Sequence, residues 1–118
     1  MKIANLRDVA PTQELPGVLK REVITASDGA PNFCMRVFDI DPGVSTHSHS
    51  HSWEHEVFIL TGRGVAVSGE KKTPIKKDSV IFVPPDEHHY FTNTGKTTMR
   101  FICLIPNSAK YSSCSIGG

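Results

Sequence analysis

The sequence predicts a single all-β domain, and two features of its 118 residues support this prediction. Short segments that are apolar or alternate between apolar and polar residues recur along the chain, separated by breaks rich in Gly, Pro and Asp. No segment carries a sustained helical period. Several short strands joined by tight turns are typical of a β-sandwich or β-barrel, and a chain of this length can bury a core without disulfides.

The predicted strands are, in chain order, Phe33–Ile40, Glu56–Thr61, Gly64–Ser68, Ser79–Val83, His89–Thr92 and Thr98–Ile105. The breaks between them read DPG, TGRG, SGEKKT, PPDE and NTGK, which supply residues that tight turns require. Residues 1–32 are less regular, although Leu19–Ile24 has the composition of a further strand. Residues 107–118 end in small and polar residues, so we expect a flexible tail there.

The nearly equal numbers of positive and negative side chains argue against a strongly charged partner such as nucleic acid or an anionic membrane. Lys and Arg number 13 and Asp and Glu 12, so the net charge is +1, and we expect no nucleic-acid or membrane partner. The apolar runs are far below the ~18 residues that a membrane span needs, and the first residues lack the apolar segment of a signal peptide. We therefore expect a cytoplasmic protein with free thiols at Cys34, Cys103 and Cys114.

Four of the six histidines lie in the stretch HSHSHSWEH, residues 47–55. If this stretch is extended, His47, His49 and His51 point to one side, His55 can return from the next strand, and His88 or His89 can join from another. Neutral imidazoles are usual ligands of Zn, Cu, Fe and Ni. Composition alone is equally compatible with an exposed His/Ser-rich run.

A wider pattern separates these two interpretations. The segment Gly43-VSTHS-His49-S-His51-SWE-His55-EVFILT-Gly62 and the segment Asp78-SVIFV-Pro84-P-Asp86-EH-His89-YFT-Asn93 resemble the two motifs of the cupin family in every spacing. His55 stands where the family usually has Glu, and Asp78 and Asp86 stand where it has Gly. Since Asp tolerates left-handed turns better than most residues, these two replacements are compatible with the fold.

This resemblance implies a cupin double-stranded β-helix, or jelly-roll barrel, over residues 33–106. It also implies a homodimer as the common assembly, with the segment 1–32 pairing at its interface. The metal ligands carried over from the motifs are His49, His51, His55 and His89. The sequence is similar to a four-histidine bacterial subgroup whose first motif reads HSHxWEHE, which implies one divalent transition metal per chain: Mn, Fe or Ni, with Zn or Cu as alternatives.

Glu54 and Glu56 compete with His55 for the fourth ligand position, because a carboxylate is also a suitable ligand for Mn or Fe. Only His55 leaves six residues before Gly62, and its neighbours on a strand point to the opposite face. We therefore favour His55. His88 should face away from the site that His89 enters.

Strand alternation and the resemblance together predict a substrate pocket. Phe101, Cys103 and Ile105 share one face of the last strand, Trp53 lies at the rim, and Arg36 points either into the barrel or outward. The four-histidine ligand set that the resemblance implies, together with this apolar pocket, predicts a metal-dependent oxygenase acting on a small organic substrate. Two alternatives stay open: a non-catalytic small-molecule-binding or regulatory module, and a metal-assisted isomerase.

Overall fold

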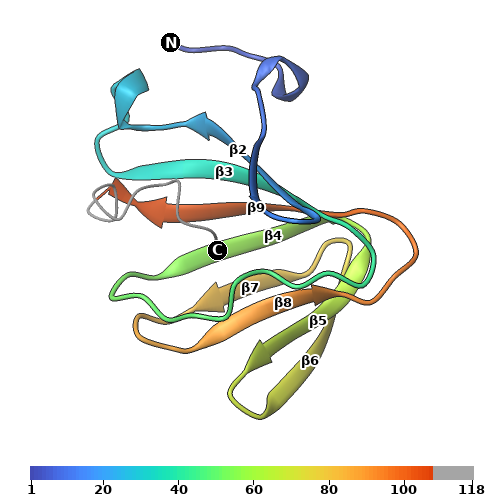
Figure 1. The fold of residues 1–118 in the computed structure, drawn as a ribbon. Helices are drawn as coiled ribbons and strands as arrows, with labels where there is room; N and C mark the ends of the chain where they lie inside the picture. Colours follow the sequence, from blue (N-terminus) through green and yellow to red (C-terminus); the bar gives the residue numbers. More distant parts are fainter. Residues whose placement is uncertain (108–118) are drawn as a thin grey trace.

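The computed structural model describes residues 1–107, and within this range the chain forms nine strands and two short 3-10 helices (Figure 1). The helices are η1 (Leu6–Asp8) and η2 (Ala26–Asp28). The strands are β1 (Thr12–Leu15), β2 (Val18–Ile24), β3 (Phe33–Ile40), β4 (His55–Thr61), β5 (Arg63–Ser68), β6 (Lys71–Lys76), β7 (Val80–Val83), β8 (His89–Asn93) and β9 (Met99–Pro106).

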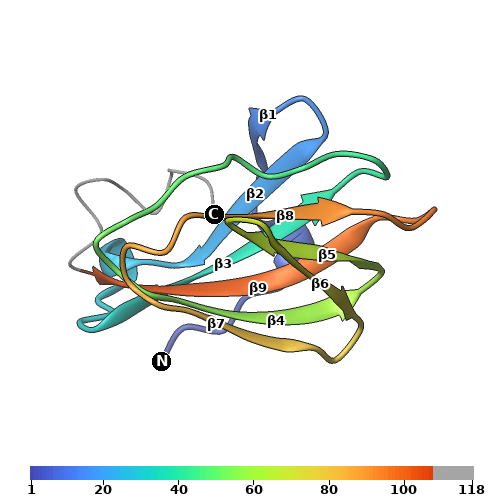
Figure 2. The same cartoon turned by 90° about the horizontal axis from the view of Figure 1, so that it is seen from below.

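The strands build two antiparallel sheets that face each other, and the prediction of an all-β jelly-roll barrel is confirmed. The larger sheet has the order β1-β2-β3-β9-β4-β7, and the smaller has the order β6-β5-β8. In Figure 1 the smaller sheet lies below the larger one, and Figure 2 shows the same arrangement from below, with β1 at the top of the view. The long connection between β3 and β4 is tied to β8 by backbone bridges at Ser45 and His49.

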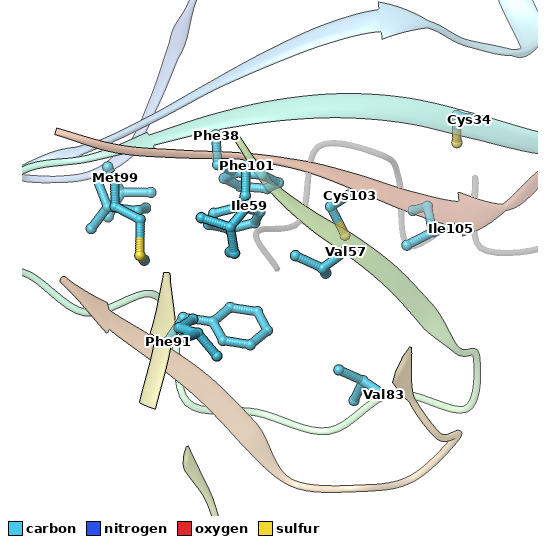
Figure 3. Packing of buried hydrophobic residues seen from close by; sticks show 13 residues of the cluster. Cys34, Phe38, Val57, Ile59, Val83, Phe91, Met99, Phe101, Cys103 and Ile105 are labelled. Atoms are coloured by element: carbon cyan, nitrogen blue, oxygen red, sulfur yellow. The ribbon is translucent and has the colours of Figure 1, made fainter. Parts of the chain in front are cut away.

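The core fills the space between the two sheets because alternate residues of each strand point into it. On β9, Met99, Phe101, Cys103 and Ile105 are all buried. Figure 3 shows Phe91 of the smaller sheet pointing toward Phe101 of the larger one, with ring centroids 5.5 Å apart. The barrel is thus closed by side chains at its centre, and any site must lie toward one end.

The N-terminal segment adds two strands to the larger sheet. The predicted strand Leu19–Ile24 is confirmed and begins one residue earlier, at Val18. β1 was not predicted. β2 pairs with β3 of the same chain, so part of the segment 1–32 extends the barrel sheet, and its pairing with a partner subunit stays a prediction. At the other end, Asn107 is buried and its backbone N–H donates to the carbonyl of Asn32, whereas the rest of the expected tail, residues 108–118, lies outside the described residues.

The segment SGEKKT was predicted as a turn, and this is wrong in part because Lys71–Lys76 forms β6. The alternation typical of a strand is missing from this segment because only Ile75 is buried, and the other five residues of the strand, three of them lysines, are exposed. β6 also contains Pro74, which is tolerated because β6 is the edge strand of its sheet.

The turn residues behave as their sequence positions predict. Asp78 and Asp86 have φ values of 74° and 68°, in the left-handed region where the motif usually has Gly. Gly62 lies in the same region, with a φ of 84°. Within residues 1–107 no helix has the length and apolar character required to span a bilayer.

Candidate metal centre

The backbone brings the two histidine motifs together at one end of the barrel. His49 and His89 form an antiparallel bridge, in which the His49 N–H donates to the His89 carbonyl at 3.3 Å and the His89 N–H donates to the His49 carbonyl at 3.0 Å. The N–H of Asp86 donates to the carbonyl of His51 at 2.5 Å. The turn of the second motif therefore holds the extended loop of the first.

β4 orients the fourth histidine. His55 is the first residue of the strand and is only 1% exposed, whereas Glu54 and Glu56 on either side of it are exposed. This alternation follows from the strand pleat, which sends neighbouring side chains to opposite faces. The imidazole is directed into the barrel, and the two competing carboxylates are directed out of it.

The four imidazoles that the motifs assign form one cluster. The ring centroids of His49 and His51 are 4.1 Å apart, those of His51 and His55 are 5.2 Å apart, and those of His55 and His89 are 4.9 Å apart. The His49 and His89 centroids are 5.5 Å apart. Among residues 1–107, however, no group of three or more His, Cys, Asp or Glu side chains is arranged as a ready-made metal site. Metal binding would therefore require rotation of the rings, whose terminal torsion is broad and soft.

His55 is held in the form that a metal requires. Burial, together with the neighbouring His89 and Arg36, lowers the pKa of His55 to about 2. The imidazole is therefore neutral at physiological pH, and only a neutral imidazole has a lone pair to donate. Its Nε2 is buried and has no hydrogen-bond partner among the described residues. A buried polar atom in this state is uncommon, and an imidazole nitrogen of this kind fits the role of a metal ligand.

The tautomer of His89 is set by its neighbour. Nδ1 of His89 lies 2.9 Å from the backbone carbonyl oxygen of Glu87. Since a carbonyl oxygen only accepts, Nδ1 carries a proton, which leaves Nε2 as the nitrogen that could bind a metal. Support of a ring nitrogen by a carbonyl is the arrangement usually found behind histidine ligands of metals.

The remaining histidines lie outside the cluster. His47 is exposed, with its ring centroid 6.2 Å from that of His49. His88 is also exposed, and its Nε2 lies 2.6 Å from the Ser48 hydroxyl. This agrees with the expectation that His88 faces away from the site. Trp53 stacks on His51 with ring centroids 4.3 Å apart and an angle of 7° between the planes, so it covers one side of the cluster.

Arg36 points into the barrel, which settles the direction that the sequence left open. It is fully buried, its Nη2 donates to Cys103 Sγ at 3.0 Å, and its guanidinium lies 5.2 Å from the centroid of the Phe38 ring. Cys103 Sγ also lies 3.3 Å from Nδ1 of His55. Arg36 and Cys103 thus reach the histidine cluster, whereas Phe101 stacks on Phe38 in the packed core.

A cavity of about 460 Å³ borders the cluster, and the sequence did not predict its walls. It has His89 and Phe91 on one side and Val67, Ile75 and Val83 among its apolar residues. None of the five predicted pocket residues lines it. The alternating pattern of these strands identifies inward-facing residues, but the opening between the sheet edges β6 and β7 depends on long-range packing.

The two cysteines among the described residues differ in oxidation state. Cys103 has a free thiol and is buried, as expected, and burial raises the pKa of this thiol, which the nearby Arg36 offsets only in part. The expectation of a free thiol is wrong for Cys34, which is disulfide-bonded. Cys114 lies outside the described residues.

Comparison with known families and proteins gives a consistent result. The family model of the Cupin domain matches residues 36–105. The chain is 32% identical over 105 residues to the oxalate-binding protein of Thermotoga maritima, an alignment that covers 88% of this chain and 84% of that protein.

Two solved structures illustrate the likeness in three dimensions. The polyketide cyclase RemF from Streptomyces resistomycificus superposes with a TM-score of 0.82 at 29% identity, covering 91% of this chain and 80% of that one. The ectoine synthase from P. lautus superposes with a TM-score of 0.79 at 17% identity, covering 95% and 85% of the two chains. The second likeness concerns the fold alone.

Proposed function

Because the chain belongs to the cupin domain family, we propose that it binds one divalent transition metal through His49, His51, His55 and His89. The observation that carries the proposal is the state of His55. Its imidazole is buried and neutral, and its Nε2 has no hydrogen-bond partner in the described chain while three further imidazoles lie around it.

The donor chemistry supports a transition metal. Four uncharged imidazole nitrogens suit Fe or Ni, with Zn or Cu as alternatives, better than the hard cations Ca²⁺ and Mg²⁺, which prefer oxygen. Mn is included because of the resemblance to the four-histidine subgroup. Exposed Glu54 and Glu56 contribute no negative charge to the cluster. When bound, such a metal supplies Lewis acidity and, in the case of Mn or Fe, access to dioxygen chemistry.

We propose further that the protein is an oxygenase acting on a small organic substrate. The residues of the chain would contribute an apolar, water-poor surrounding: the core closes the barrel below the cluster, Trp53 covers His51, and the cavity beside His89 has room for a small molecule. A cluster of neutral imidazoles leaves the charge of a bound metal uncompensated, which favours an anionic or enolate-like substrate.

A second function is favoured by one of the comparisons. The relative from Thermotoga maritima is named as an oxalate-binding protein, so a non-catalytic module that holds a small dicarboxylate at the metal is the alternative.

A metal-assisted isomerase is a further alternative. It requires an acid or base beside the cluster, and Glu87 on the cavity wall is the carboxylate in that position.

The first test is the metal content of protein purified without metal-affinity columns, compared among wild type, His55→Ala and Glu56→Ala. We expect about one metal per chain in the wild type, loss in His55→Ala and retention in the adjacent control Glu56→Ala. Loss in Glu56→Ala alone, or a metal-free wild type, contradicts the proposed ligand set.

The second test separates the functions. The metal-loaded protein is supplied with a panel of enolisable diones and aryl-alkenes while oxygen uptake is measured, and with oxalate while binding is measured by calorimetry. Oxygen consumption that depends on substrate supports the oxygenase. Saturable oxalate binding without oxygen uptake supports the binding module, and conversion of substrate without oxygen supports the isomerase.

The homodimer is likewise a proposal. Phe58, Val80 and Phe82 are 40%, 75% and 60% exposed on the outer face of β4 and β7, where an apolar patch favours contact between proteins. Light scattering of wild type and Phe82→Glu tests this: we expect a dimer that the charge disrupts, and a monomeric wild type contradicts it.

A further inference from the structure

Three side chains on neighbouring strands form a continuous polar path to the cluster. Arg36 on β3 lies directly opposite Cys103 on β9, and Cys103 lies opposite Val57 on β4. His55 precedes Val57 by two residues, so it is the diagonal neighbour of Cys103 on the same inward face. The contacts follow this geometry: 3.0 Å from Arg36 Nη2 to Cys103 Sγ, and 3.3 Å from Cys103 Sγ to His55 Nδ1.

The direction of these contacts is constrained by chemistry. A guanidinium only donates, so the sulfur of Cys103 accepts from Arg36. A thiol can either accept from His55 Nδ1–H or donate to a bare Nδ1. In the second case the proton of the neutral imidazole would lie on Nε2, where the described residues provide no acceptor for it. Since orphaned buried N–H groups are rare, the first arrangement is favoured.

We propose that Cys103, held by Arg36, is a positioning residue that keeps the proton of His55 on Nδ1 and so presents the lone pair of Nε2 to the metal. This inference rests on the proposed function, because it concerns the same histidine cluster. It assigns Cys103 a role beyond packing: the sulfur accepts N–H groups from two sides, as the carbonyl of Glu87 does for His89.

The alternative is that Cys103 is only a small apolar residue of the core, to which it also belongs. Two substitutions separate these roles. Cys103→Val keeps the approximate volume and removes the sulfur acceptor. Ile105→Val is the matched control, because Ile105 lies on the same face of the same strand, is equally buried and loses one methylene.

The first readout needs no metal. Long-range ¹H–¹⁵N NMR of the His55 ring in metal-free protein distinguishes the Nδ1–H from the Nε2–H tautomer. We expect the Nδ1–H form to dominate in wild type and Ile105→Val, and the Nε2–H form to increase markedly in Cys103→Val. A wild-type ring in the Nε2–H form, or an unchanged tautomer in Cys103→Val, overturns the proposal.

The second readout is the dissociation constant for Mn²⁺ and for Zn²⁺ alone, by competition with a chelating dye. Loss of a group that orients a ligand typically weakens metal binding 10–100-fold. We expect about this loss for Cys103→Val, a smaller one for Arg36→Met, and a change within about twofold for Ile105→Val. Equal affinity in Cys103→Val and wild type overturns the positioning role.

The two readouts also distinguish this inference from the proposed function. If wild type binds neither metal, the proposed function fails, and the NMR measurement still decides whether Cys103 controls the tautomer. If wild type binds metal and loses it in His55→Ala but not in Cys103→Val, the metal site stands and the positioning role fails. If Cys103→Val does not fold, Arg36→Met provides both readouts.

Discussion

Replacement of His55 by Leu should remove a specific part of the pH dependence of stability in the metal-free protein. The pKa of His55 is lowered from an ordinary value of 6.5 to about 2 in the folded state, chiefly by burial. Between these two values the unfolded chain binds a proton that the folded chain does not, so the free energy of unfolding rises with pH throughout this window. Stability is lost as the pH falls below 6.5.

The magnitude follows from the two pKa values. Each pH unit within the window is equivalent to about 1.4 kcal/mol, and allowing for partial titration near pH 6.5, His55 removes about 2 kcal/mol of unfolding free energy between pH 7 and pH 5. Leu cannot titrate. We therefore expect wild type to lose about 2 kcal/mol more than His55→Leu over this interval.

Urea denaturation of chelator-treated protein at a series of pH values measures this difference. His49, His51 and His89 also face the imidazole of His55, so the comparison between the two proteins, rather than the wild-type curve alone, isolates the contribution of His55. Above pH 7.5 the gap between the two proteins should be constant. Parallel curves from pH 7.5 to pH 5 refute the claim that a neutral His55 is buried in the folded chain.

Two further predictions concern the scaffold. Gly62→Ala should lower the free energy of unfolding by at least about 2 kcal/mol, because the φ of Gly62 is 84° and an added Cβ would lie 2.8 Å from the carbonyl oxygen of Thr98. Gly43→Ala is the control and should cost only about 1 kcal/mol, because Gly43 has a similar φ of 80° but nothing lies within 4 Å of an added Cβ. Thermal melts compare the two variants, and equal losses would contradict the steric argument. Burial opposes ionisation of Asp39, but hydrogen bonds from Arg100 and Arg21 outweigh it and lower the pKa of this carboxyl. The stabilisation is therefore present above pH about 4 and is lost as the pH falls further. In denaturant titrations below about pH 4, the free energy of unfolding of Asp39→Asn should fall less steeply with pH than that of wild type, and equal slopes would contradict this.

The sequence predicted the parts of the fold that depend on local pattern. β3 has the predicted bounds because Phe33–Ile40 is a run of mainly apolar and aromatic residues that ends at the DPG turn. Asp78 and Asp86 adopt the left-handed conformation that their positions require. β6 was missed because a lysine-rich edge strand carries almost no alternation, since both of its faces are exposed.

In the candidate site, too, only the features that depend on local pattern could be predicted from the sequence. Alternation placed His55 inside and Glu56 outside, and the structure has them on these sides. Alternation could not choose the direction of Arg36, because a period of two residues defines two faces without saying which of them is buried. The contacts between Arg36, Cys103 and His55 depend on the register of three strands that are far apart in sequence. Such contacts follow from long-range pairing and are invisible to a local pattern.

The buried imidazole of His55 lowers the stability of the folded protein, and this cost is evidence for a functional role. An apolar residue at position 55 would pack on Val57 and Cys103 without an unsatisfied nitrogen and without acid sensitivity. A packing role therefore gives no reason for His at this position, whereas a ligand role requires a neutral ring that can share a cation with neighbouring imidazoles. Local rules broken together at one place are typical of a functional site.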